Sequence, residues 1–281
     1  MMKKYFNILL VFSGFLFVGC ENFFKSEVEP PKISTQSQLV IHSYISADSP
    51  DIKVKVAMSN PTFGNHSQSG IPSVSNAQVT LRNDQNESIT LPYESNSEYY
   101  TISATTFPIE AGKTYHLEVR DSHGNKATAH CTVPQNIVGD IQNVTVIDTK
   151  NEGSDAYQVS FDFQDRANER NYYIPVILVR QELSNYDRRL EAKFFTDNNR
   201  DGNRITVRSE KDFGSAQYVK QVVVTLYTTD VNFYEYGRSV SLQNDTEDIG
   251  PFGETVILNS NIKGGLGVFG AYTKKVVTLE L

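Results

Sequence analysis

Tryptophan is absent from the 281 residues, and cysteine occurs only twice. Because many sugar-binding platforms stack their ligand on aromatic rings, most often tryptophan, this absence disfavours a lectin. Positive charge is also scarce, with 26 Lys and Arg against 33 Asp and Glu and a formal net charge of -7. No nucleic-acid partner is expected, since phosphate binding requires a basic surface. Hydrophobic residues at 39% and charged residues at 21% exclude a disordered chain and a polytopic membrane protein.

An apolar stretch over residues 5–18 follows Lys3 and Lys4 at the N-terminus. This pattern predicts a secretory signal peptide over residues 1–19, because the stretch is too short for a comfortable membrane span. The residues Phe17-Val18-Gly19-Cys20 resemble a bacterial lipobox, with Phe17 in place of the usual Leu. Cys20 is therefore predicted to carry diacylglycerol. The alternative is a secreted protein in which Cys20 is incidental.

Lipidation of Cys20 would leave Cys131 unpaired in a compartment where disulfides usually form. We therefore predict that Cys131 is buried and inert. Residues 20–37 are predicted to be the lipidated cysteine and an extended tether, because they lack periodicity and contain Pro30-Pro31. Several acyl chains on one cysteine give a stable anchor, which would hold the folded body at a membrane surface.

Short alternating runs separated by turn residues follow the tether, a pattern typical of antiparallel sheets. The clearest hairpin spans residues 113–134 and turns at His123-Gly124. Pairing about this turn sets Tyr115 opposite Cys131 on an apolar face. The chain is thus predicted to be mainly β. A boundary near Gln135 would make residues 38–134 an immunoglobulin-like or transthyretin-like sandwich.

Residues 135–281 are predicted to form a second β-rich domain with one short helix. Asp230 is a suitable cap for a helix that would run over residues 230–243. The expected strands, read from alternating or continuous apolar runs, are 143–147, 157–163, 172–179, 192–195, 205–208, 218–227, 255–258 and 276–281.

The glycine-rich run from Gly265 to Gly270 has the spacing of a dinucleotide fingerprint. That fingerprint requires a helix after the loop, whereas a strand-like TKKVVTLEL follows here. No phosphate site is expected. Two interpretations stay open, which are a bend in closely packed backbone and a partner-facing loop. The residues of the possible loop are Gly264, Gly265, Gly267, Phe269, Gly270 and Tyr272.

Two groups are weak candidates for metal binding, and no cofactor is expected. Asp197, Asn199 and Asp201 match the first half of a calcium loop, but Arg208 stands where a glutamate is required. His116 and His130 would lie opposite each other on the outer face of the hairpin, without a clear third ligand. A polar turn and two solvated histidines explain these residues without a metal.

Charged residues around Asp165 and Glu169 resemble an acid and base pair, although alternating signs this close usually pair on a surface. The chain lacks G-x-S-x-G, H-E-x-x-H and an available cysteine nucleophile. An enzyme is therefore not expected, and a hydrolase acting through Asp165 and Glu169 is the weakest alternative.

Several segments resemble an uncharacterised family of Bacteroidota outer-membrane lipoproteins, a domain of unknown function. The most specific is SNIKGGLGVFGAY (260–272), preceded by an aromatic helix NFYEYGRSVSLQ and by Pro251-Phe252; further ones are LVIHSYIS, NAQVTL, AGKTYHLEV and ERNYYI. The resemblance implies an outer-membrane lipoprotein encoded near TonB-dependent receptors. It brings no catalytic residues. The single acidic residue after Cys20, Glu21, leaves the cell-surface and periplasmic faces both open.

Taken together, these features predict a lipid-anchored accessory or binding protein that partners a TonB-dependent transporter in nutrient capture or gating. The alternative is a fimbrial or adhesive subunit that assembles by strand addition at an exposed sheet edge.

Overall fold

The computed structural model describes residues 37–60, 71–149, 156–182, 187–190, 193–210, 218–247 and 256–281. Cys20, the tether up to residue 36 and Pro251-Phe252 lie outside these ranges. The described residues are mainly β, as predicted, with one helix, α2 (Val231–Glu247). Within these ranges, no helix has the length and apolar character needed to cross a membrane.

The strands are β1 (Leu39–Ser46), β2 (Asp51–Met58), β3 (Gln78–Asn83), β4 (Ser88–Leu91), β5 (Tyr93–Glu94), β6 (Tyr99–Ser103), β7 (Thr114–Arg120), β8 (Lys126–Thr132), β9 (Val138–Asp148), β10 (Tyr157–Gln164), β11 (Tyr172–Gln181), β12 (Arg188–Leu190), β13 (Phe195–Thr196), β14 (Arg204–Arg208), β15 (Val219–Thr229) and β16 (Gly265–Glu280).

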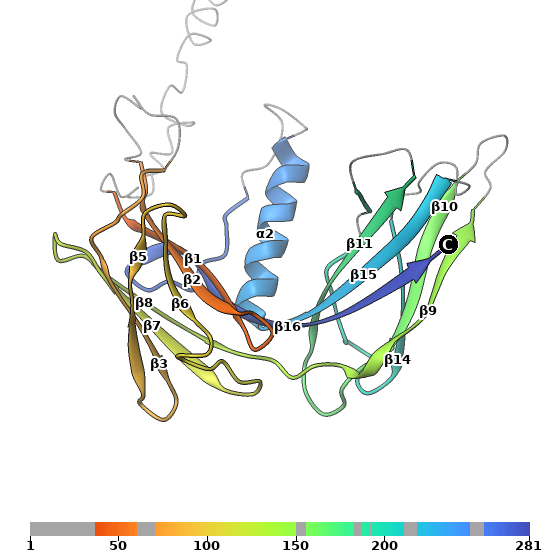
Figure 1. Cartoon of the computed structure of the whole chain (residues 1–281), viewed down its shortest axis with the longest axis horizontal. Helices are drawn as coiled ribbons and strands as arrows, with labels where there is room; N and C mark the ends of the chain where they lie inside the picture. Colours follow the sequence, from red (N-terminus) through yellow and green to blue (C-terminus); the bar gives the residue numbers. More distant parts are fainter. Residues whose placement is uncertain are drawn as a thin grey trace, which may run out of the picture. The chain divides into compact units, whose positions relative to one another are not determined.

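A nine-stranded sheet runs through the unit formed by Ser37–Leu281 (Figure 1). Its order is β12-β11-β15-β16-β1-β2-β6-β5, and β13 pairs with β11. A four-stranded sheet, β4-β3-β7-β8, and a three-stranded sheet, β14-β10-β9, complete the fold. Strand β16 is the link within the large sheet, because it pairs in parallel with β1 and antiparallel with β15.

Two hydrophobic cores lie on the same face of the large sheet. The first contains buried residues of β1 to β4 and β6 to β8, and the second contains buried residues of β9 to β12, β14 and β15. Strand β16 serves both cores. Phe269 and Ala271 belong to the first core, whereas Val277 and Leu279 pack against the second.

The change of core falls at the predicted boundary near Gln135, since Val133 belongs to the first core and Ile137 to the second. The sequence prediction missed the return of residues 262–271 to the first core. This return joins the two sandwich-like parts through one sheet, because a strand from the end of the chain completes the core that begins at Leu39.

Local predictions are confirmed in detail. In the hairpin, Tyr115 is opposite Cys131, Leu117 is opposite Ala129, and His116 is opposite His130. Asp121 closes the turn, since one of its carboxylate oxygens accepts hydrogen bonds from the N–H groups of His123 and Asn125. Asp230 caps α2 as expected, because its carboxylate accepts a 3.0 Å hydrogen bond from the Phe233 N–H.

Two predictions about the C-terminal part are wrong. Residues 256–258 of the expected strand 255–258 are not in a strand, and Ile257 is 86% exposed, so this short apolar run belongs to neither core. Of the two interpretations of the glycine-rich run, the loop is wrong, because Gly265 to Tyr272 form the first half of β16, whereas Gly265 and Gly267 do pack closely on the backbone of β1. The expected strand 276–281 is only the second half of the same element.

Candidate ligand-binding cleft

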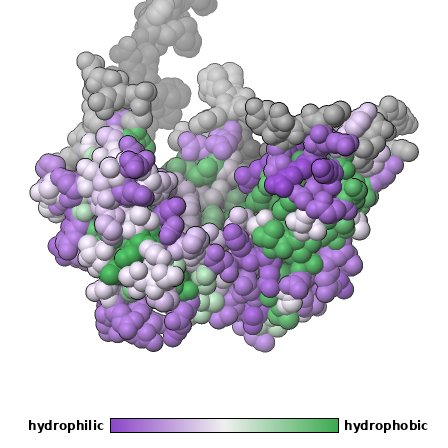
Figure 2. Space-filling view, in the orientation of Figure 1, coloured by the Kyte–Doolittle hydropathy of each residue, from purple (hydrophilic) through white to green (hydrophobic). Residues whose placement is uncertain are grey.

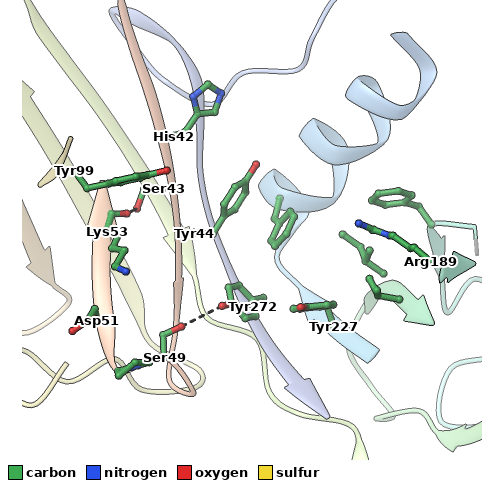
Figure 3. Close-up of a pocket in the computed structure, with 15 residues that line it drawn as sticks. His42, Ser43, Tyr44, Ser49, Asp51, Lys53, Tyr99, Arg189, Tyr227 and Tyr272 are labelled. Carbon is green, nitrogen blue, oxygen red and sulfur yellow. Dashed lines mark hydrogen bonds between the residues drawn. The ribbon is translucent and has the colours of Figure 1, made fainter. Parts of the chain in front are cut away.

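A cleft of about 680 Å³ lies on the face of the large sheet opposite the two cores (Figure 3). Alternation along the strands produces this face: Ile41 of β1 and Leu226 of β15 enter the cores, whereas Tyr44 and Tyr227 point the other way. The lining residues come from seven strands, one turn, the segment before β13 and α2, and they are His42, Ser43, Tyr44, Ser49, Pro50, Asp51, Lys53, Tyr99, Ile174, Val176, Arg189, Phe194, Tyr227, Phe233 and Tyr272.

Aromatic rings form a contiguous group at the centre of the cleft. The ring centroids of Tyr44 and Phe233 are 4.2 Å apart, and Phe233 contacts Tyr272 edge to face at 6.0 Å. Tyr227 continues the group with its centroid 5.4 Å from that of Tyr272. All four side chains are partly exposed. Together they offer both ring faces and ring edges to a bound molecule.

Close packing of backbone places the helix over the cleft. Gly270 makes this possible, because a Cβ at that position would lie 2.8 Å from the Cβ of Phe233. The Asp230 carboxylate also accepts a 3.0 Å hydrogen bond from the Ala271 N–H, which ties the start of α2 to β16. The helix N-terminus and the glycine-rich half of β16 therefore fix the ring of Phe233 between Tyr44 and Tyr272.

Polar groups surround the rings. His42 Nε2 and Tyr236 Oη are 2.6 Å apart, and burial lowers the pKa of His42, which keeps its imidazole neutral at pH 7. Burial, and then the nearby Tyr236 and Asp230, raise the pKa of the Tyr44 phenol. The Ser49 hydroxyl and the Tyr272 hydroxyl are 3.2 Å apart.

Charged side chains stand on two walls of the cleft. In Figure 3, Asp51 and Lys53 lie on the β2 wall, and Arg189 reaches in from the opposite wall. The cleft thus combines an aromatic floor with a few charged and hydroxyl groups at its rim, which is the usual composition of a small-molecule site. None of the lining residues is a nucleophile that bonds to a general base of the same lining.

Comparison with known families adds one finding. A model of the domain of unknown function DUF4249 matches residues 25–277. The chain belongs to the DUF4249 family. This match includes the SNIKGGLGVFGAY segment and all the residues of the cleft. No curated protein matches the chain.

Solved structures give little further information on this DUF4249 chain. One titled "Cytokine receptor complex - Crystal form 1A" is 10% identical, covers 85% of this chain and 95% of its own, and has a TM-score of 0.25. Another, titled "Crystal structure of CBD12 from CALX1.2", is 7% identical, covers 83% of this chain and 98% of its own, and has a TM-score of 0.19. At these TM-scores neither alignment informs the fold or the function.

The glycine-rich motif of the DUF4249 chain has a packing role. A Cβ at Gly267 would lie 2.1 Å from the Ile41 carbonyl oxygen, and one at Gly264 would lie 2.3 Å from the Lys126 carbonyl oxygen. Both glycines have positive φ, of +104° and +81°. Of the predicted loop residues, only Tyr272 lines the cleft. The segment is therefore a close contact between β16, β1 and β8.

Asp197 and Asp201 meet a third carboxylate, Asp165, and one oxygen of each lies within 4.8 Å of the others. Backbone N–H groups already bond to the cluster: Gly202 donates to Asp165 at 2.8 Å, and Asn171 donates to Asp197 at 3.1 Å. Burial, with Asp197 and Asp201 nearby, raises the pKa of Asp165 despite hydrogen bonds from Tyr173 and Gly202. These hydrogen bonds explain the cluster without a metal, because the carboxylates hold the loop around residues 197–203 closed.

The predicted acid and base pair is not assembled as a site. Asp165 is 1% exposed and bonds to the Tyr173 hydroxyl, so a substrate cannot reach it. The Glu169 carboxylate pairs with Arg166 at 3.3 Å on the surface. Neither residue lines the cleft.

His116 and His130 lie side by side as predicted, with ring centroids 5.9 Å apart. They line a separate polar groove of about 700 Å³ with Arg82, Lys263 and other residues. Burial, then Arg82 and His130, lower the pKa of His116. Glu118 is already engaged by Arg120 at 2.7 Å and Lys126 at 2.8 Å. Within the described ranges, no acidic or thiol group completes a metal site with the two histidines.

Cys131 is 1% exposed and unpaired, as predicted, and burial raises the pKa of its thiol. The sequence analysis missed Tyr44, Tyr227 and Phe233. One available signal was the placement of tyrosines at outward positions of strands whose alternate residues are aliphatic, as in LVIHSYIS. Large rings at such positions indicate a covered or ligand-binding sheet face.

Proposed function

We propose that this chain is a lipid-anchored accessory protein of the outer membrane that captures a small ligand in the aromatic cleft for a TonB-dependent transporter. It performs no chemical reaction on that ligand. The cleft carries the proposal, because its size and its aromatic floor with few polar groups suit a ligand of several hundred cubic ångströms. Whether the protein faces the cell surface or the periplasm is left open.

The sequence supports two parts of the proposal, which are the lipid anchor and the transporter as partner. The lipobox-like residues before Cys20 and the tether over residues 20–37 support attachment to lipid through Cys20. The resemblance to lipoproteins encoded near TonB-dependent receptors supports the transporter as partner. A flexible tether would let the cleft move between free ligand and the mouth of a neighbouring transporter.

The chemistry of the lining describes the ligand. Flat apolar faces would stack on Tyr44, Phe233 and Tyr272, while hydroxyl or carboxyl groups would reach Lys53 on one wall and Arg189 on the other. The chain has a net charge of -7, so these cations would act locally and not by steering ligands from a distance.

The partner is tested by crosslinking the lipidated protein in its own outer membrane, purifying it and identifying the crosslinked residues by mass spectrometry. Recovery of a TonB-dependent barrel is the expected result. Recovery of the chain alone, in repeated preparations with intact Cys20 lipidation, would remove the transporter from the proposal.

Capture is tested separately by native mass spectrometry of the protein released from its membrane. A small molecule should leave with the wild-type protein and be lost in Tyr44→Ala, because that ring packs against Phe233 in the cleft. Tyr218→Ala is the matched control, since Tyr218 is 44% exposed and lies outside the cleft. Equal recovery from both variants would place the molecule elsewhere.

Assembly by strand addition is the second candidate. One observation favours it: beyond Tyr272, no described strand pairs with β16 on the side that β1 occupies before that point. Deleting residues 274–281 would be a poor test, because it would also remove Val277 and Leu279 from contact with the second core. Point substitutions at that edge test the idea without this damage.

A further inference from the structure

The second half of β16 is paired with a described strand on one side only, although β9 also contacts β16 and Lys275 donates a 3.3 Å hydrogen bond to the Asp140 carboxylate of β9. Residues 272–280 pair with β15, but β1 covers the other side of β16 only as far as Tyr272. Beyond this point the described residues provide no strand on that side. Val276 is 51% exposed there and Leu281 is 60% exposed. Figure 2 shows apolar surface, in green, over the part of the molecule where β15 and β16 run in Figure 1.

Alternation along β16 identifies the open backbone groups. The Leu281 N–H donates to the Lys220 carbonyl oxygen at 3.1 Å, so odd-numbered residues direct their N–H and C=O groups toward β15. Even-numbered residues direct theirs the opposite way. The Lys274 N–H does so, and it donates to the Asp48 carboxylate at 3.1 Å just past the end of β1. The N–H and C=O groups of Val276, Thr278 and Glu280 therefore point to the open side.

We propose that this edge pairs antiparallel with the same edge of a second copy of the chain, about a two-fold axis at Val277. In this register Lys274 of one copy lies opposite Glu280 of the other, and Val276 lies opposite Thr278. Both pairs occur twice by symmetry. Val276 and Thr278 are even-numbered in both copies, so they exchange backbone hydrogen bonds across the axis. The Lys274 N–H stays bonded to Asp48, so Lys274 meets Glu280 through its side chain.

Charge selects this register and this partner. An axis at Val276 would pair Lys274 with Thr278, and an axis at Thr278 would pair Val276 with Glu280. An axis at Lys275 would set that lysine against its own copy, which is repulsive. Only the axis at Val277 places each Lys274 opposite a Glu280, with two β-branched residues paired between them. The segment is thus complementary to itself.

The pairing would form a closed dimer and not a fibre. A two-fold contact uses the same surface on both copies and leaves no second copy of that edge for growth. The inference is therefore distinct from fimbrial assembly, and it does not depend on the cleft, which opens on residues up to Tyr272 of β16. It turns an open edge, normally an aggregation hazard, into a defined interface.

Sedimentation equilibrium of the full chain in detergent micelles, from about 1 μM to 100 μM, measures the dimer. The wild type should dimerise. Lys274→Glu and Glu280→Lys should each raise the dissociation constant at least about tenfold, because each converts two attractive pairs into two repulsive ones. The double variant Lys274→Glu with Glu280→Lys should restore dimerisation. Glu110→Lys, an exposed acid elsewhere, is the matched charge control and should dimerise like the wild type.

Thr278→Pro tests the backbone contribution. It removes an N–H that points to the open side, so the β15 pairing stays intact and circular dichroism should match the wild type. Loss of the dimer in this variant is expected. A wild-type chain that is monomeric over the whole range overturns the proposal. A dimer that persists in Thr278→Pro, or whose dissociation constant is unchanged by both charge reversals, overturns it as well.

Discussion

Asp230 stands where β15 ends and α2 begins, and its buried carboxylate serves both α2 and β16. The Asn232 side chain donates a further 2.8 Å hydrogen bond to it. Burial outweighs these donors and raises the pKa of Asp230 to about 6. One side chain therefore caps the helix, joins the helix to the sheet and titrates near neutral pH.

Replacement of this residue should change how stability depends on pH. Because the folded-state pKa of Asp230 is raised from 3.8 to about 6, the unfolded chain releases the proton first as pH rises. The contribution of Asp230 to the free energy of unfolding of the wild type therefore falls by roughly 2.5 kcal/mol between pH 4 and pH 7. Asp230→Asn keeps an accepting oxygen for the cap and cannot ionise, so its stability relative to the wild type should rise over that range.

Urea unfolding of both proteins at pH 4 and pH 7 measures the effect, because the other carboxylates cancel in the difference. Asp230→Ala is the reference for the cap alone and should be less stable at both values, by about 1 kcal/mol or more. A difference between wild type and Asp230→Asn that is the same at pH 4 and pH 7 would contradict the prediction.

Gly267 and Gly124 allow the two roles of glycine to be separated. Both have positive φ, of +104° and +88°, but a Cβ at Gly267 would strike the Ile41 carbonyl oxygen, whereas a Cβ at Gly124 would meet nothing within 4 Å. Gly124→Ala should destabilise the fold by about 1 kcal/mol through backbone conformation alone. Gly267→Ala should cost a further 1 to 3 kcal/mol, approximately, because β1 and β16 must separate. Thermal unfolding compares them, and equal losses would show that the contact with Ile41 is relieved easily.

At the scale of elements, a side chain hydrogen-bonds to the backbone of β16 on each side, at the point where the neighbouring strand ends. Asp48 does this beyond β1. On the other side, beyond β15, Asn261 accepts a 3.0 Å hydrogen bond from the Phe269 N–H and donates a 2.8 Å bond to the Phe269 carbonyl oxygen. The amide of Asn261 thus takes the place of a missing strand residue, and the segment before β16 is fastened to it.

Asn261→Ala should show how much these two hydrogen bonds contribute to stability. Because it leaves both backbone groups of the buried Phe269 without their partner, we expect a loss of about 2 to 4 kcal/mol in the free energy of unfolding. Asn259→Ala is the control, since Asn259 is exposed and its side chain bonds only to the Glu235 carbonyl oxygen, at 3.3 Å. Comparable losses in the two variants, measured by chemical unfolding, would refute the role given to Asn261.

Elements built from neighbouring residues could be predicted, and those built from distant ones could not. The hairpin at Asp121–Lys126 was predictable with its register, because a short turn fixes which residues face each other. The cap at Asp230 was predictable for the same local reason. Pairing of Leu39 with Gly265 leaves no local mark, and glycine normally weakens strands, so the first half of β16 was interpreted as a bend or loop. The cleft was missed because residues of β1, β11 and α2 meet only through that pairing.

At the scale of the whole described unit, two cores share one sheet and one strand, so they should unfold together. Strand β16 cannot leave one core without disturbing the other, because Ala271 packs in the first core and Val277, six residues further along the same strand, packs against the second. Cys131 lies in the first core, and quantitative mass spectrometry of its labelling in urea reports the opening of that core. Its midpoint should coincide with the loss of β structure followed by circular dichroism. Two separate transitions would show that the cores are independent.

The shared strand also sets the order of folding events during synthesis. Asp48 and Lys274, which meet at the end of the β1 and β16 pair, are 226 positions apart. Residues of the first core therefore emerge from the ribosome long before the strand that completes them, and contacts of such long range form slowly. Until β16 has been synthesised, the edge of β1 that pairs with it presents unpaired N–H and C=O groups. A chaperone that shields extended segments would thus be most needed by the earliest strand of this chain.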